Sequence, residues 1–125
     1  MSHFPRAAAL AFALAATAAP PCFAQDELAK LAELTAATHT CTPTGVAAMT
    51  SRIHVRCSAA APGGIVFFAV PTSDINRAAR MLAMFQTALA AGRQLTVFYD
   101  AADTSGVAYG CAANDCRPTS GAEIW

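Results

Sequence analysis

The feature that most restricts the fold is one long amphipathic segment at residues 75–89, which has strand-like sequence on both sides. Its apolar residues recur at steps of three and four over four turns, namely Ile75, Ala78, Leu82, Phe85 and Leu89. Such a stripe predicts a helix with one face against a core. Thr72 or Ser73 can cap its start, Asp74 carries the charge that a helix N-terminus favours, and Gly92 can end it.

Strand patterns flank this helix. Residues 52–57 alternate polar and apolar, and residues 65–70 form a continuous apolar run, which predicts a half-buried strand and a buried one. Residues 94–99 alternate again after the helix. Weaker strand patterns occupy residues 44–50, 107–111 and 122–125, a short helix is predicted at residues 26–37, and loops are expected at residues 38–43 and 100–106.

The resulting order is a short helix, three strands, a long helix and two or three strands. This is the element order of the OB-fold, a five-stranded Greek-key barrel, although other small α+β domains share it. We therefore predict an α+β, mostly β domain. It is a small barrel of five to six strands, and the long helix lies between the third and fourth strands and plugs one end.

Residues 1–24 have the pattern of a secretory signal peptide. A weakly basic start with Arg6 is followed by a nearly continuous apolar run at residues 7–19 and by a small-residue cleavage site ending at Ala24. We expect cleavage there, export to the periplasm or beyond, and a single domain over residues 25–125. The alternatives fit less well, because a membrane anchor needs about 20 apolar residues and Pro21 disfavours lipidation of Cys22. We expect no membrane span elsewhere.

Export would leave four cysteines, and an even number in an exported chain of this size predicts two disulfides. Four cysteines allow three pairings. Cys111 and Cys116 flank a turn-like insert, so their local pairing is favoured, which leaves Cys41 with Cys57. The alternative is a metal site, but the nearby histidines do not have ligand spacing. We therefore expect neither a metal nor another cofactor.

The charge balance argues against a nucleic-acid partner. Eight Lys and Arg residues balance eight Asp and Glu residues, and only one of the eight basic residues is a lysine. A phosphate-binding surface needs clustered basic residues. The chain is also 55% apolar and 13% charged, which argues against a disordered protein.

Catalytic motifs are absent from the sequence. There is no Gly-Xaa-Ser-Xaa-Gly elbow, and the thiols are expected to be paired. His39 lies in an expected loop without an evident partner, and Asp100 and Asp103 lie in another, where acidic residues commonly form turns. We therefore predict a binding protein and not an enzyme.

Several stretches of the chain resemble the B subunits of bacterial multi-subunit toxins of the subtilase-cytotoxin and typhoid-toxin kind. These stretches are Thr44-Gly45-Val46, Val55-Arg56-Cys57, Phe85-Gln86-Thr87-Ala88-Leu89, Gly92-Arg93-Gln94-Leu95-Thr96-Val97-Phe98-Tyr99 and Gly110-Cys111-Ala112-Ala113-Asn114-Asp115-Cys116. The resemblance implies an exported OB-fold subunit that binds a sialylated glycan. It also implies a homopentameric ring and a separate catalytic A chain.

By this resemblance the glycan site comprises Thr44, Gly45 and Tyr99. A hydroxyl group can hydrogen-bond the sugar, and an aromatic ring can cover its apolar face. The chain departs from the family at Thr40, where the family has an acidic residue, and in its shorter loops. The alternative role for Tyr99 is in the core, because it is in phase with Leu95 along its strand.

The outer face of the long helix is the expected oligomer interface. It carries Arg77, Arg80, Met81 and Met84, and its methionines make it more apolar than a face in free solvent. The alternative is an ordinary exposed amphipathic surface. For the whole protein, the alternative to a glycan-binding subunit is a free-standing periplasmic structural or protein-interaction domain without a sugar site.

Overall fold

A computed structural model describes residues 36–125, and this part of the chain is α+β and mostly β. Its elements are β1 (Ala36–Cys41), β2 (Pro43–Ala48), β3 (Arg52–Ala61), β4 (Ile65–Pro71), α2 (Ile75–Ala91), β5 (Leu95–Asp100), the 3₁₀ helix η1 (Ser105–Tyr109) and β6 (Cys116–Ile124). The predicted signal peptide lies outside the described residues. So does most of the helix predicted at residues 26–37.

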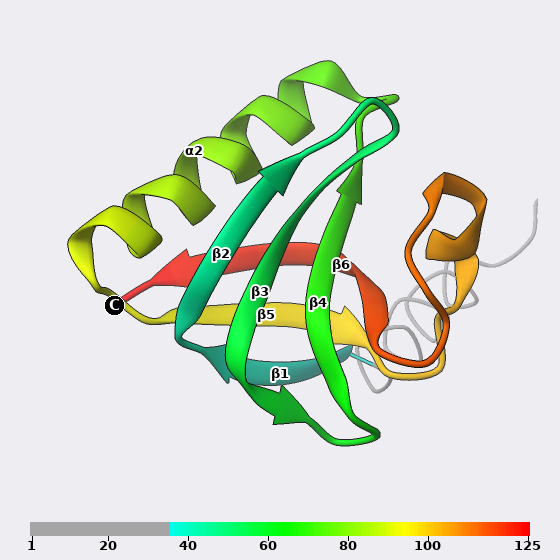
Figure 1. Cartoon of the computed structure of the whole chain (residues 1–125), viewed down its shortest axis with the longest axis horizontal. Coiled ribbons are helices and arrows are strands. Elements are labelled where there is room, and N and C mark those ends of the chain that lie inside the picture. Colours follow the sequence, from blue (N-terminus) through cyan, green and yellow to red (C-terminus); the bar gives the residue numbers. More distant parts are fainter. Residues whose placement is uncertain (1–35) are drawn as a thin grey trace, which may run out of the picture.

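The six strands of residues 36–125 form one mixed sheet in the order β1-β5-β6-β4-β3-β2. Neighbours are antiparallel except β4 and β6, which are parallel with Phe67 opposite Cys116. The end strands of this order, β1 and β2, are consecutive in the chain and separated only by Thr42. The sheet therefore bends into two layers, with β2, β3 and β4 in front of β1, β5 and β6 and with α2 along one side (Figure 1).

The main core joins these two layers to α2. Phe68 of β4, Phe85 of α2 and Leu95 of β5 are fully buried, with 0% of their surface exposed. Val55 of β3 and Val97 of β5 are also at 0%. Because apolar side chains from front strands, back strands and helix meet here, α2 is an integral part of the domain.

The predicted long helix is confirmed, and its two ends have clear physical causes. The carboxylate of Asp74 caps the start, with its Oδ1 accepting a hydrogen bond from the Arg77 backbone N–H at 3.0 Å. The cap is thus Asp74 and not Thr72 or Ser73. Gly92 ends the helix in the left-handed region at a φ of 64°, which glycine adopts without steric cost.

The buried face of α2 is rotated from the predicted stripe. Its buried residues are Ala78, Met81, Phe85 and Ala88. Ile75, by contrast, is 77% exposed and Leu89 is 39% exposed. The placement of Met81 on the outer face was therefore wrong. The small side chains of Ala78 and Ala88 allow close contact, so the helix turns this face inward.

Two predictions about irregular segments were also wrong. Residues 38–41, expected to be loop, belong to β1, which pairs with β5 so that Thr38 lies opposite Phe98. Residues 107–109, expected to start a strand, belong instead to η1, which ends at Gly110 with a φ of 90°. The strands predicted at residues 52–57, 65–70 and 94–99 are confirmed, as β3, β4 and β5.

Both predicted disulfide pairings are confirmed. Cys41 at the end of β1 is bonded to Cys57 of β3, with Cα atoms 5.0 Å apart. This bond spans the corner where β1 passes into β2. Cys111 and Cys116, with Cα atoms 5.4 Å apart, close the loop between η1 and β6.

Candidate functional site

The structure does not bring the predicted glycan-binding residues together. Tyr99 is only 2% exposed and its ring packs edge-on against Phe68, with centroids 5.0 Å apart. Thr44 is on β2, where its hydroxyl donates to the Arg56 carbonyl at 3.3 Å, and Gly45 pairs with the same residue. Tyr99 borders the first cavity described below, whereas neither Thr44 nor Gly45 lines it. The core role of Tyr99 is the one that the structure shows.

One cavity among the described residues has a volume of about 410 Å³. It lies where the end of β5, η1, the middle of β6 and the first turn of α2 meet. We call it the Tyr109 pocket, and its polar and aromatic lining includes Arg77, Asp100, Asp103, Ser105, Tyr109 and Ser120. Loops and helix ends thus supply most of its polar groups, which rest on a sheet framework.

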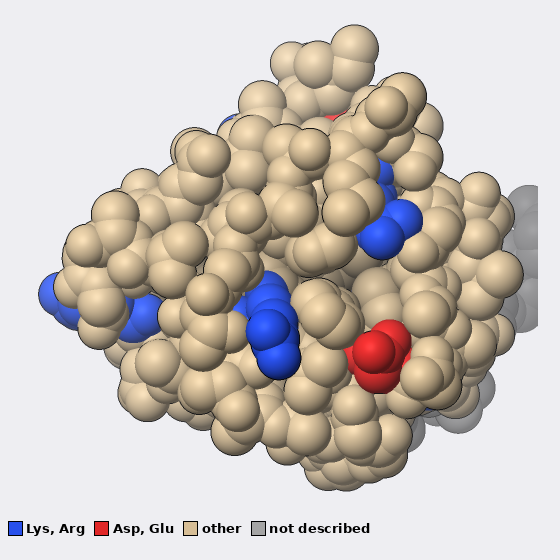
Figure 2. Space-filling model, viewed as in Figure 1, with Lys and Arg blue, Asp and Glu red and all other residues tan. Residues whose placement is uncertain are grey.

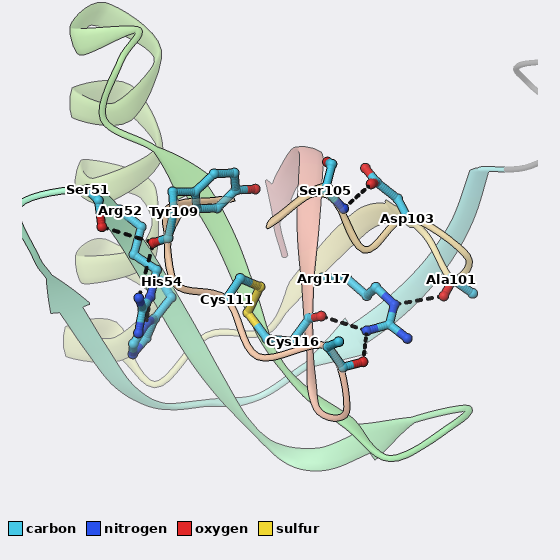
Figure 3. The surroundings of a disulfide bond; sticks show 11 residues. Ser51, Arg52, His54, Ala101, Asp103, Ser105, Tyr109, Cys111, Cys116 and Arg117 are labelled. Atoms are coloured by element: carbon cyan, nitrogen blue, oxygen red, sulfur yellow. Dashed lines mark hydrogen bonds between the residues drawn. A yellow bond between two sulfur atoms is a disulfide. The ribbon is translucent and has the colours of Figure 1, made fainter. Parts of the chain in front are cut away.

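Two aspartates shape the rim of the Tyr109 pocket. Asp100 Oδ1 accepts a hydrogen bond from the Ala102 N–H at 2.9 Å. Asp103 Oδ1 accepts one from the Ser105 N–H at 2.8 Å (Figure 3). These are Asx turns, which bend the chain out of β5 and into η1. The expected turn-forming role of both residues is confirmed. The same turns also hold their carboxylates beside the cavity.

Arg77 enters the pocket from α2. Its Nη2 atom donates a hydrogen bond to the Thr119 carbonyl of β6. Thr119 is itself held in place, because its hydroxyl oxygen lies 2.8 Å from the carbonyl oxygens of both Phe98 and Gly121. This contact fixes the guanidinium group, which otherwise has several rotamers, at one side of the cavity.

Tyr109 is anchored through its backbone. Its carbonyl accepts hydrogen bonds from Ser51 Oγ at 2.9 Å and from Arg52 Nη1 at 3.2 Å (Figure 3). Gly110 then reverses the chain, and a Cβ atom there would collide with the Arg52 guanidinium group. The backbone of Tyr109 is therefore held at the pocket by hydrogen bonds, and its side chain packs against the buried Cys111–Cys116 cluster.

Burial and two charged side chains act on the pKa of the Tyr109 phenol. Burial raises the pKa of its phenol above the usual 10.0, the carboxylate of Asp103 raises it further, and Arg77 opposes them. The hydroxyl is therefore protonated at neutral pH. In that state it can both donate and accept a hydrogen bond.

A second cavity of about 180 Å³ lies beside the Cys111–Cys116 disulfide. It is lined by Arg52, His54 and Phe67, among others. Arg52 Nε donates to His54 Nδ1 at 3.3 Å (Figure 3). The imidazole packs edge-on against the Phe67 ring, with centroids 5.2 Å apart. Burial and the charge of Arg52 lower the pKa of His54 from 6.5. A neutral imidazole here is consistent with its role as the acceptor.

We expect this histidine to make the domain less stable in mild acid. Below pH 6.5 the unfolded chain binds a proton at His54 that the folded chain resists, so the free energy of unfolding falls as pH decreases toward the folded pKa. Urea unfolding at pH 7.5 and 5.5 measures this loss. In His54→Gln, whose amide oxygen can still accept from Arg52, the loss should be smaller than in the wild type. An equal loss of unfolding free energy in the wild type and in His54→Gln would contradict the assignment of this pH dependence to His54.

The predicted interface residues of α2 have different environments. Met81 is 7% exposed and belongs to the core, Met84 is half-buried against the core, and Arg77 lines the Tyr109 pocket. Of these four residues, only Arg80 is exposed. Along the whole of α2 ten residues are exposed, and Arg80 is the one charged residue among them. Figure 2 likewise shows only isolated charged side chains on this view of the molecule.

An apolar cavity of about 270 Å³ lies at the start of α2. It is lined by Met49 and Ile53 on one side and by Ile75, Ala79 and Leu82 of the helix on the other. Met49 is 45% exposed and Ile75 is 77% exposed. This edge of the helix is thus a mainly uncharged and partly apolar surface.

The part of the chain from residue 36 to residue 125 holds no group of three or more His, Cys, Asp or Glu side chains arranged to bind a metal ion. None of its helices has both the length and the hydropathy of a membrane span.

Comparison of the chain with models of known protein families, with characterised proteins and with solved structures finds no match. The likeness to toxin B subunits therefore rests on the quoted sequence stretches alone.

Proposed function

We propose that this chain is an exported, non-catalytic, glycan-binding domain whose site is the Tyr109 pocket. The observation that carries the proposal is one cavity of about 410 Å³ lined by an aromatic ring together with hydrogen-bond donors and acceptors. Small-molecule sites commonly have volumes of about 300–1,000 Å³, so a one- or two-sugar unit fits. The two disulfides and the signal-like N-terminal sequence support export.

The lining matches the chemistry of a sugar. Each sugar hydroxyl can both donate and accept hydrogen bonds, so a site needs groups of both kinds. Arg77 supplies donors, the carboxylates of Asp100 and Asp103 supply acceptors, and the Tyr109 hydroxyl supplies both. The Tyr109 ring offers an apolar surface for the C–H face of the sugar.

We also propose that the barrel is an OB-fold. The support is that β1 and β2 are separated only by Thr42 and can be taken as two halves of one bent strand. Five strands then remain, and α2 lies between the third and the fourth, as the sequence predicts. The two halves pair with β5 and β3, at opposite ends of the sheet order, which closes the barrel.

The toxin resemblance implies a sialylated ligand, and it extends the proposal to a homopentameric ring and a separate catalytic A chain. The low charge on the exposed side of α2 supports self-association, since exposed helix faces are normally rich in charged residues. The mass of the exported chain in solution, measured by light scattering, distinguishes a pentamer from a monomer. A monomer would remove the ring from the proposal and leave the pocket intact.

The second candidate function is a free-standing protein-interaction domain. The apolar cavity at the start of α2, with Ile75 77% exposed, favours it. Such a domain would bind through this helix edge. It would bind no sugar at the Tyr109 pocket.

A glycan array followed by calorimetry tests the proposed site. Tyr109→Ala should weaken binding about tenfold or more, because the sugar loses the aromatic surface. Ser51 and Arg52 still hold the backbone carbonyl of residue 109 in this variant, whereas the packing of the ring against the Cys111–Cys116 cluster is lost, so circular dichroism of the variant checks that the domain stays folded. Thr44→Ala is the matched control and should bind like the wild type. Loss of binding in the Thr44 variant alone would place the site on β2 instead.

A further inference from the structure

We propose that the Tyr109 pocket selects sugars without a carboxylate, either uncharged or amino-bearing, over acidic sugars. This inference rests on the proposed glycan-binding function and narrows its ligand class. It departs from the sialylated ligand that the toxin resemblance implies. The charged side chains that line the pocket, and the hydrogen bonds that they already make, favour such sugars.

The charged lining of the pocket is dominated by acceptors. Its charged side chains are Asp100, Asp103 and Arg77, so it has an excess of one negative charge. All three are half-buried, and water therefore screens them less than it screens fully exposed charges.

The arginine is already engaged. Its Nη2 atom donates one N–H to the Thr119 carbonyl, so a ligand carboxylate can use only the guanidinium N–H groups that remain. Arg117, at the start of β6, does not line the pocket. It donates to the carbonyls of Ala101, Ala113 and Cys116, each at 2.7 Å (Figure 3).

The two aspartates, in contrast, keep acceptor capacity. A carboxylate has two oxygens and about four lone-pair directions. Asp100 and Asp103 each use Oδ1 for one backbone N–H, at 2.9 and 2.8 Å. Their remaining capacity suits a ligand rich in donors, such as sugar hydroxyl or ammonium groups. A ligand carboxylate would meet two like charges and one partly used arginine.

The test uses pairs of a neutral and an acidic sugar. In galactose with galacturonic acid and in glucose with glucuronic acid, a carboxylate replaces the CH₂OH group, and in lactose with sialyllactose a sialic acid residue is added. Glucosamine is the amino-bearing probe. Binding to the exported chain is measured by NMR titration at low salt. For each pair in which binding is detected, we expect the uncharged sugar to bind at least tenfold more tightly than the acidic one. Glucosamine should likewise bind at least tenfold more tightly than glucuronic acid if it is the preferred ligand.

Asp103→Asn removes one charge and keeps Oδ1 as the acceptor for the Ser105 N–H. In this variant the acidic sugar of each pair should bind more tightly, so the preference for the neutral sugar should shrink severalfold. Asp115→Asn is the control, because Asp115 does not line the pocket, and it should leave this preference unchanged. Tighter wild-type binding of sialyllactose or a uronic acid would overturn the inference and leave glycan binding standing. Failure of every sugar to bind would overturn the proposed function and the inference with it.

Discussion

Replacement of Cys41 and Cys57 together by alanine is expected to lower the free energy of unfolding by about 3 kcal/mol. The disulfide closes a loop with a sequence separation of 16, and a loop of about that length costs the unfolded chain about 3 kcal/mol of entropy. It also joins β1 to β3 across the corner at Thr42, where the curled sheet turns back on itself. Its loss should therefore affect the whole domain.

The matched control is the other disulfide. Cys111 and Cys116 are separated by only 5 in sequence, so the same relation predicts a loss of about 2 kcal/mol for their double alanine variant. Urea unfolding without reductant gives both values. A larger loss from the local disulfide than from the Cys41–Cys57 bond would contradict the view that this bond holds β1 to β3 at the corner.

Phe85→Ala is expected to lower the free energy of unfolding by about 3–5 kcal/mol, the usual cost of deleting a fully buried aromatic ring. Its ring is 0% exposed between α2 and the sheet. Leu89→Ala, one turn later and 39% exposed, should cost less than about 1 kcal/mol. Urea unfolding of both variants tests the rotated helix face. Equal losses at the two positions would favour the originally predicted stripe.

The strongly patterned elements could be predicted from the sequence. The first half of β3 and all of β5 alternate between buried and more accessible residues, and four of the seven residues of β4 are buried. The helix cap and the glycine stop are local signals. β1 was missed because Ala-Ala-Thr-His-Thr-Cys has no apolar alternation. Its pairing with β5, more than 50 residues away, holds it as a strand, and a local pattern cannot show that.

The orientation of the helix illustrates a different limit. Ile75 and Leu89 fit an apolar stripe as well as Met81 does, so the sequence alone could not tell which of them turns inward. The contact with the sheet decides it, through the fully buried Phe85. A helix with few charged residues leaves the boundary between its two faces poorly marked.

The candidate site was predicted less well than the fold. Tyr99 was assigned to a ligand by resemblance, whereas its alternation with Leu95 and Val97 pointed to the core, where it lies. Asp100 and Asp103 were recognised as turn residues, and that turn is what presents them to a cavity. The cavity itself could not be foreseen, because it forms only where α2, η1 and β6 meet.

The central claim is that the Tyr109 pocket binds a glycan, and one measurement tests it most directly. Residues 25–125, labelled with ¹⁵N, are titrated with the best ligand from the glycan array, and the amide NMR shifts are followed. We predict that the largest shifts fall on residues 99–110 and 117–121, around the pocket. Shifts centred on residues 43–48 of β2, or on the exposed edge of α2, would contradict the account.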